Sequence, residues 1–215
     1  MIKLIINADD FGYSKVFNEK ILDLLEKDFI KSTTVLVNWI TDEQKEQIQR
    51  LKKLNTQKNI SIGLHVESKS RAESILDQKE IARQYELFKK IFGFEPSHID
   101  VHKFIDSYEE ATKFADEHNL PIRNHGQKNI KTKNTPQPFF RFGGKYWEFN
   151  WPEMNKFLKQ MQAGGTYELC VHPGQYDPNS ASAFNKSREK DYQGIIELQP
   201  VLKEENIKSI SYNDL

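Results

Sequence analysis

Short β-rich runs alternate with amphipathic segments along this 215-residue chain, and the alternation limits the folds that it can adopt. Strands are expected where β-branched and apolar residues cluster, at residues 2–6, 33–37, 60–64, 98–101, 121–123, 167–171 and 207–212. Helices are expected where apolar residues recur at helical spacing, at residues 16–27, 42–54, 78–92, 108–118, 152–162 and 191–205. This order predicts an α/β fold with a mostly parallel sheet, and about seven units favour a barrel over an open sheet.

One segment, residues 124–151, does not follow this rhythm. It is aromatic and turn-rich, and an irregular excursion of this length in a compact domain is usually a functional loop or a subunit contact. We therefore expect an insertion that lines the substrate site or forms a homodimer contact. Elsewhere the chain has no Gly/Ser linker, internal repeat or low-complexity block, which favours a single domain over residues 1–215.

Composition excludes several classes of partner. The 31 Lys and Arg residues balance 31 Asp and Glu residues, so no overall positive charge favours binding to nucleic acid. Cys170 is the only cysteine, which rules out an intramolecular disulfide and fits a reducing compartment. No apolar run approaches the roughly 20 residues that a bilayer needs, and Asp9 interrupts the N-terminus too early for a signal peptide. These features predict a cytoplasmic protein without a membrane partner.

Titratable side chains follow several of the predicted strands. They are Asp9 and Asp10, His65, His98 and His102, Arg123, and His172. Any one of them has a purely structural explanation, because paired aspartates often cap helices and an isolated histidine is usually a packed side chain. In a parallel barrel, however, all of these strand ends lie on one rim, where such enzymes place their sites. We therefore expect these groups to converge, whereas His118 and His125 fall on a helix and in the insertion.

One carboxylate and two imidazoles that face a common point suit a catalytic divalent ion with open positions for water. We predict that Asp10, His65 and His102 are the ligands of such an ion. His98 is four residues from His102, which on an extended segment separates the two by about 13 Å, so both are not expected to bind one ion. This donor set admits Zn, Co, Mn, Ni or Mg, and we expect Mg or Zn.

The remaining groups suggest acid–base chemistry. With Asp10 on the ion, Asp9 is free to take a proton from water that the ion has acidified. His172 comes from another strand and could protonate a leaving group, and Arg123 could pair with Asp9 and hold it ionised. These roles together predict hydrolysis of an acyl or similar bond.

The same residues lie in motifs that resemble those of the YdjC-like carbohydrate deacetylases, a family that includes chitooligosaccharide deacetylase. The motifs are Asn7-Ala8-Asp9-Asp10-Phe11-Gly12, Ser32-Thr33-Thr34-Val35-Leu36-Val37-Asn38, Gly63-Leu64-His65, Pro96-Ser97-His98-Ile99-Asp100-Val101-His102, Glu168-Leu169-Cys170-Val171-His172-Pro173-Gly174 and Ile210-Ser211-Tyr212-Asn213-Asp214-Leu215. The resemblance implies a NodB-like distorted β/α barrel that removes an acetyl group from an N-acetylated sugar. It also implies a divalent metal held by Asp10, His65 and His102, with Asp9 as base and His172 as acid.

The chain departs from the family pattern at two places. Phe104 stands where the family commonly has a histidine two residues after the ligand, and the segment after His65, residues 67–71, is short. The short segment predicts a more open cleft. Two alternatives stay open: a metal-dependent hydrolase of another bond, and a catalytically silent sugar-binding protein whose aromatic insertion stacks on sugar rings. Asp9 and His172 favour an enzyme, because binding alone requires neither.

Overall fold

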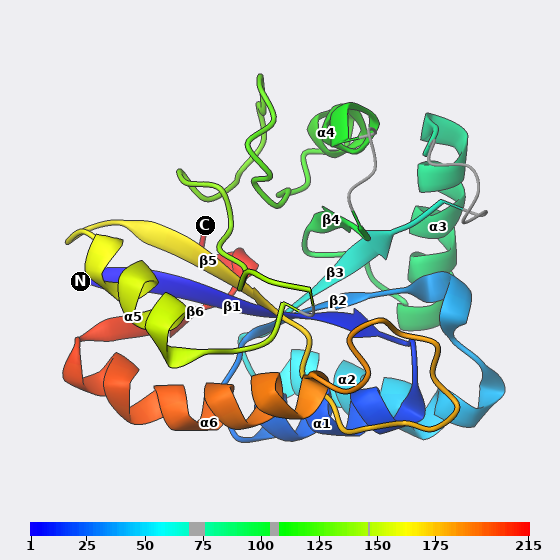
Figure 1. Ribbon diagram of the computed structural model, residues 1–215. Coiled ribbons are helices and arrows are strands. Elements are labelled where there is room, and N and C mark those ends of the chain that lie inside the picture. The colour runs from blue at the N-terminus through cyan, green and yellow to red at the C-terminus, as the bar shows by residue number, and fades with distance from the viewer. Residues whose placement is uncertain (69–75, 104–107, 146) are drawn as a thin grey trace.

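The computed structural model describes residues 1–68, 76–103, 108–145 and 147–215. Its strands form one parallel sheet in the order β4-β3-β2-β1-β5, and β6 also pairs with β1 (Figure 1). The strands are β1 (Ile2–Phe11), β2 (Ser32–Val35), β3 (Ser61–Val66), β4 (Ile99–Val101), β5 (Thr166–Val171) and β6 (Ile207–Ile210). Because the strands are parallel, their carboxyl ends lie at the same side of the sheet, as the sequence predicted.

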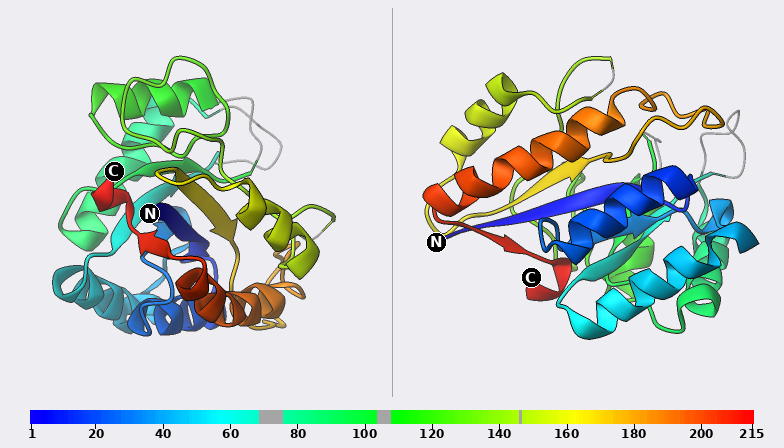
Figure 2. Two further views of the ribbon diagram at one scale, coloured as in Figure 1. Left: turned by 90° about the vertical axis from the view of Figure 1, so that its left-hand side faces the viewer. Right: turned by 90° about the horizontal axis from the view of Figure 1, so that it is seen from below.

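Helices follow most of the strands. They are α1 (Lys15–Glu26), α2 (Lys45–Gln57), α3 (Gln78–Phe92), α4 (Tyr108–Glu117), α5 (Trp151–Gln160) and α6 (Arg188–Glu204). Helices α1, α2 and α6 lie next to one another along one face of the sheet, and α3 and α4 lie near β3 and β4 (Figures 1 and 2). None of the described helices combines the length and the apolar character needed to cross a bilayer.

Helix α3 illustrates how local sequence defines an element. Asp77 precedes the helix and its carboxylate accepts the backbone N–H of Glu80, which caps the first turn. Phe88 and Phe92, one helical turn apart, are buried and stack on one another. Gly93 ends the helix with φ of 82°, a left-handed conformation that glycine adopts without steric strain. The predicted bounds of this helix are confirmed.

The sheet is a half-barrel whose two edges are bridged by irregular chain. Ile122 pairs in parallel with Ile99 of β4, and Phe140 pairs in parallel with Leu169 of β5. The strand expected at residues 121–123 is therefore wrong, because only this isolated bridge forms before the chain turns at Gly126, where φ is 85°. The α/β fold with a distorted barrel is confirmed.

The insertion contributes to the core as well as to the barrel edge. Phe142 and Phe149 are buried, and their rings pack 4.9 Å apart. Phe140 stacks on Phe157 of α5 at 4.2 Å. Part of the segment 124–151 therefore closes one edge of the half-barrel and packs in the core. The aromatic content alone did not predict this structural role.

Candidate active site

A break in the pairing of β1 brings two adjacent aspartates to one cavity. Strand β1 pairs regularly with β2 as far as Ala8, shifts register, and pairs again at Phe11. Asp10, inside the irregular stretch, has φ of 71°. Neighbouring side chains of a regular strand point to opposite faces, and such irregularities can redirect a side chain. Asp9 and Asp10 are both buried, and both line the same cavity.

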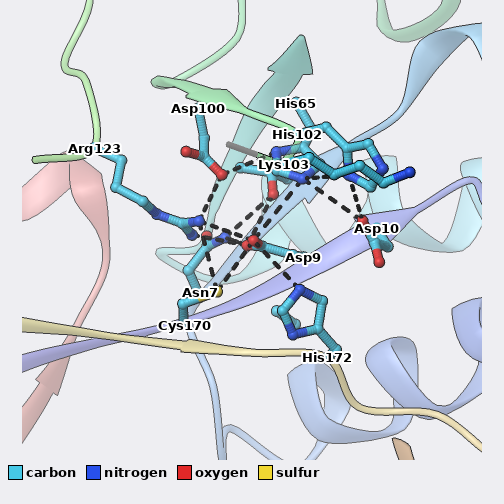
Figure 3. A network of polar contacts seen from close by, with 12 residues as sticks. Asn7, Asp9, Asp10, His65, Asp100, His102, Lys103, Arg123, Cys170 and His172 are labelled. Carbon is cyan, nitrogen blue, oxygen red and sulfur yellow. Dashed lines mark hydrogen bonds and ion pairs between the residues drawn. The ribbon is translucent and has the colours of Figure 1, made fainter. Parts of the chain in front are cut away.

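Asp10, His65 and His102 form a compact cluster (Figure 3). Asp10 Oδ1 lies 3.2 Å from His102 Nδ1 and 3.6 Å from His65 Nε2, and the two imidazole nitrogens are 3.2 Å apart. Within the described part of the chain, Asp10 Oδ1 is buried and accepts no hydrogen bond. One carboxylate oxygen and two imidazole nitrogens that face one point fit a divalent cation.

Asp100 orients one of these histidines. Its Oδ2 lies 2.9 Å from Nδ1 of His65, so when the ring is neutral its proton is on Nδ1 and the Nε2 lone pair is directed at the cluster. Burial lowers the pKa of His65, but the facing carboxylates of Asp100 and Asp9 outweigh it and raise that pKa to about 9. Asp100 also accepts a 2.8 Å contact from His125 Nε2.

Arg188 holds the second oxygen of Asp10. Its Nη2 donates a 2.6 Å hydrogen bond to Asp10 Oδ2, and its side chain is fully buried. Burial raises the pKa of Asp10, but the charges of Arg188 and His102 more than compensate and keep that pKa well below its usual range. Asp10 therefore stays ionised, with Oδ2 held by Arg188 and Oδ1 facing the two imidazoles.

Arg123 holds Asp9 by a two-pronged contact. Its Nη1 and Nη2 donate to Oδ2 and Oδ1 of Asp9 at 2.8 and 2.7 Å. Asn7 donates a further bond of 2.6 Å, and the Cys170 thiol lies 3.2 Å from Oδ2. Burial raises the pKa of Asp9, yet the charge and hydrogen bonds of Arg123 bring it down to about 2.

The Arg123 guanidinium serves two further carboxylates. It donates to Asp100 at 2.5 Å and to Glu168 at 2.7 Å, and the Tyr212 hydroxyl donates to Glu168 at 2.5 Å. Because the negative charges outnumber the one guanidinium, the group depends strongly on Arg123. Asp100 and Glu168 stand inside predicted strands and within the family-like motifs, but neither of them was predicted from the sequence to belong to the site.

His172 follows β5 and faces Asp9 across the cavity (Figure 3). Its Nε2 lies 3.9 Å from Asp9 Oδ2. Burial lowers the pKa of His172 to about 4, although the charges of Asp10 and Asp9 act in the opposite direction. The ring packs 4.7 Å from Phe184, and the backbone N–H donates to Asp191 at 2.7 Å.

The structure brings all six predicted site residues to one cavity of about 360 Å³. Its lining includes Asp9, Asp10, His65, His102, Arg123 and His172, together with the aromatic side chains of Tyr13, Tyr108, Phe139, Trp147 and Phe184. Phe139 and Trp147 belong to the insertion, which thus forms part of the cavity wall.

The other histidines differ from one another. His98 is buried and stacks on Tyr212 at 3.7 Å, outside the cavity lining. His118 packs against Phe114 on α4. His125, which the sequence placed in the insertion and away from the site, lines the cavity. Phe104 and most of the short segment after His65 lie outside the described residues, so the expectations about them stay predictions.

The fold and the cavity define a class of protein: parallel α/β half-barrels with a buried Asp/His cluster at the carboxyl ends of the strands. Within that class, residues 3–207 match the model of the family described as YdjC-like protein. The chain belongs to this family.

Two curated relatives span the whole chain. A carbohydrate deacetylase of Clostridium beijerinckii is 25% identical over 100% of both chains. A chitooligosaccharide deacetylase of Klebsiella pneumoniae subsp. pneumoniae is 24% identical over 99% of this chain and 98% of the relative. These alignments extend through every element that contributes to the cavity.

Solved structures share the fold. A protein of Enterococcus faecalis V583, to which cellobiose-phosphate cleavage has been ascribed, superposes with a TM-score of 0.75 at 20% identity, covering 99% of this chain and 98% of the other. A family 4 acetyl xylan esterase of Clostridium thermocellum, in complex with a cobalt ion, gives a TM-score of 0.57 at 15% identity over 99% and 89% of the two chains. At these identities the likeness establishes the fold alone.

Proposed function

We propose that this protein is a metal-dependent deacetylase that removes the acetyl group of a small N-acetylated sugar. The observation that carries the proposal is the Asp10–His65–His102 cluster with Asp9 and His172 beside it in one cavity. The family and its curated carbohydrate deacetylases support it. A chitooligosaccharide-like substrate is the first to test.

Asp10 Oδ1, His65 Nε2 and His102 Nδ1 would hold the metal. A divalent ion held there would polarise the acetyl carbonyl and lower the pKa of water bound to it. Mg and Zn are our first candidates, since one carboxylate and two imidazoles admit either ion.

Asp9 is the base in this proposal. Arg123 fixes both oxygens of Asp9, so the carboxylate keeps one orientation and its charge. A carboxylate whose pKa is about 2 is a weak base, and it can accept a proton only from water that is already strongly acidified. Metal and base therefore depend on one another.

His172 is the acid in this proposal. The amine of an amide does not depart unprotonated, so the reaction needs a proton donor on the leaving-group side. His172, whose pKa is about 4, is neutral near pH 7 and must take up a proton before it can donate one. His172 approaches from β5, on the side of Asp9 that is opposite the Arg123 contact in Figure 3.

The aromatic lining, including Trp147 and Phe184, offers apolar surface to a sugar ring and an acetyl methyl group.

The direct test is acetate release from N-acetylglucosamine and from its β-linked disaccharide. We expect release by the purified protein, loss of release with a chelator, and recovery when Zn²⁺, Mn²⁺ or Mg²⁺ is added back. The His118→Ala variant is the control, because the His118 ring packs against Phe114 of α4, away from the cavity. It should release acetate at the wild-type rate. Binding of these sugars without acetate release under any metal would favour the catalytically silent alternative.

A second test isolates His172. The His172→Ala variant should lose far more activity on an N-acetyl sugar than on an activated acetate ester, because the ester's leaving group departs without a proton. Its metal content should be unchanged. Equal loss on both substrates, or loss of the metal, would show that His172 is not the acid.

The expected homodimer and cytoplasmic location stay predictions.

A further inference from the structure

Two buried side chains in the first turn of α6 contact residues of the candidate active site: Arg188 contacts Asp10, and Asp191 contacts the backbone of His172. Arg188 and Asp191 are three residues apart, so they lie on neighbouring positions of one helix face. Both are buried, at 0% and 1% exposure. A charged first turn on a surface helix normally faces water, and the burial of both charges therefore calls for a specific reason.

Arg188 reaches the cluster through Asp10. Its Nη2 donates to Asp10 Oδ2 at 2.6 Å and lies 3.1 Å from the hydroxyl of Ser182, a residue of the cavity wall. The guanidinium lies 4.0 Å above the Phe17 ring of α1, which fixes its plane. Since Asp10 Oδ2 is occupied, Oδ1 is the oxygen that faces the two imidazoles.

The His172-Pro173-Gly174 motif makes room for this arginine. A Cβ atom at position 174 would lie 2.9 Å from Cδ and 3.0 Å from Cβ of Arg188. The Gly174 N–H also donates to the Arg188 carbonyl at 3.1 Å. The glycine of the motif thus allows the backbone after His172 to contact the start of α6 closely.

Asp191 contacts the backbone that carries His172. Its Oδ2 accepts the backbone N–H of His172 and its Oδ1 accepts the backbone N–H of Phe149, both at 2.7 Å. This contact ties the end of β5 to the last residues of the insertion. The carboxylate therefore fixes the backbone that carries the His172 imidazole.

We infer that the first turn of α6 is a positioning element, in which Arg188 orients Asp10 toward the metal and Asp191 fixes His172 relative to it. Neither residue touches the reacting atoms; each acts through a neighbour that does. The inference rests on the roles proposed for Asp10 and His172. The first test measures metal binding alone, so the role of Arg188 can be confirmed even if the protein is not a deacetylase.

The first experiment titrates the purified protein with Co²⁺ and with Mn²⁺ in the absence of substrate. The Arg188→Met variant keeps apolar packing against Phe17 but loses the hydrogen bond to Asp10. We expect its affinity to fall about 10- to 100-fold, as it does when a residue that orients a metal ligand is removed. The visible spectrum of bound Co²⁺ should also change, because Asp10 would no longer be limited to one oxygen.

Lys190→Met is the matched control, because Lys190 is a cation in the same turn whose side chain is 60% exposed. It should bind both ions like the wild type. Wild-type affinity and an unchanged Co²⁺ spectrum in Arg188→Met would overturn the inference.

Gly174→Ala provides a variant that keeps every charge, in case Arg188→Met does not fold. Its added methyl group displaces Arg188, and we expect an affinity loss of about threefold or more. A folded Gly174→Ala protein with wild-type affinity would contradict the role of Arg188.

The second experiment concerns Asp191 and uses the loaded enzyme. An amide in place of the carboxylate keeps one acceptor oxygen and presents an N–H₂ group to the other backbone N–H, so one of the two anchoring bonds is lost. We expect Asp191→Asn to lower kcat about tenfold on an N-acetyl sugar, with KM and metal affinity unchanged.

Glu189→Gln is the control for that experiment, because Glu189 lies in the same turn and accepts the N–H of Tyr176, away from His172. Wild-type kcat in Asp191→Asn would overturn its half of the inference. So would a loss of metal affinity as large as that of Arg188→Met, since Asp191 would then act on the whole site rather than on His172.

Discussion

Asp9 and Asp10 are neighbours in the chain, are almost equally buried and line the same cavity, yet their surroundings differ. Both oxygens of Asp9 accept hydrogen bonds from Arg123, and Asn7 adds another. Asp10 receives Arg188 on one oxygen, and its other oxygen accepts no hydrogen bond from the described residues. Asp9 is satisfied by the protein, whereas Asp10 is only half satisfied.

This difference assigns different chemistry to two identical side chains. A buried carboxylate oxygen without a donor is costly unless something positive reaches it, and the two histidine nitrogens beside Asp10 are placed to supply the other ligands of the proposed cation. Asp9, in contrast, keeps a fixed orientation and charge without any metal. The arginine contacts, rather than the aspartates themselves, distinguish the proposed metal ligand from the proposed base.

The largest effect is expected when either histidine beside Asp10 is replaced. The His65→Ala and His102→Ala variants should bind no metal at concentrations that saturate the wild type, and acetate release should fall to background. Metal analysis after gel filtration measures the first and an acetate assay the second. Full metal content in both variants would refute the ligand assignment.

The next largest effect is expected when Arg123, the cation that pairs with Asp9, is replaced. Arg123→Met leaves Asp9, Asp100 and Glu168 without their shared partner, and we expect a loss of about 3–5 kcal/mol in the free energy of unfolding. Urea unfolding measures it. Arg50→Met is the control: Arg50 pairs with Glu19 and Glu26 at the surface, where such pairs contribute about 1 kcal/mol or less. An equal, small loss in both variants would contradict the prediction.

A third variant changes Asp9 alone. Asp9→Asn should keep metal affinity near that of the wild type but reduce kcat by about 100-fold or more, the usual contribution of a general base. Metal titration and steady-state kinetics together distinguish this result from loss of the site. If Asp9→Asn loses the metal, or if kcat falls less than tenfold, the contrast between the two aspartates is wrong.

The smallest effect extends the comparison to Asp191, a buried aspartate whose oxygens accept backbone N–H groups instead of a guanidinium. Burial raises the pKa of Asp191 to about 7, although the two N–H donors and the Arg188 charge oppose the shift. Because this pKa is above the ordinary value of 3.8, ionising Asp191 destabilises the fold. This cost is absent below pH 4 and fully present above pH 7.

Asp191→Asn removes that titration. The free energy of unfolding of the variant, measured relative to the wild type, should therefore rise by about 1–3 kcal/mol between pH 4 and pH 7. Urea unfolding at several pH values measures the difference, in which other titrating groups cancel. A difference that stays constant with pH would mean that Asp191 is ionised throughout the range, as Asp9 is.

The full length of β1 could not be predicted from its local sequence. The sequence predicted a strand over residues 2–6 followed by a polar turn, but β1 continues to Phe11. Asn7 stays in the strand because the Ser32 hydroxyl and Asp9 satisfy its side chain, and Asp9 stays because Arg123 reaches it from 114 residues away. Polarity within the chain indicated a turn, and only the distant partners explain the strand.

Arg188 and Asp191 show the corresponding limit in the site. They stand in a run of charged residues at the start of a helix, which is typical of a solvated helix end. Arg188 contacts Asp10 across 178 residues of sequence. No local pattern predicts such a contact, because burial of the first turn of α6 depends on its contacts with Asp10 of β1 and with His172 after β5.

The sequence by itself determined the α/β alternation, the bounds of α3, and six of the residues that meet at the strand ends, because strand and helix periodicity and the parallel connection rule are local or topological properties. Only the tertiary structure decided how each of these residues is held. Which arginine reaches Asp9 and which reaches Asp10, and how the insertion closes the half-barrel, depend on contacts between segments more than 100 residues apart or on packing at the sheet edges. Hydrogen bonds to buried charges are fixed by that packing, and the packing has no signature in a short stretch of sequence.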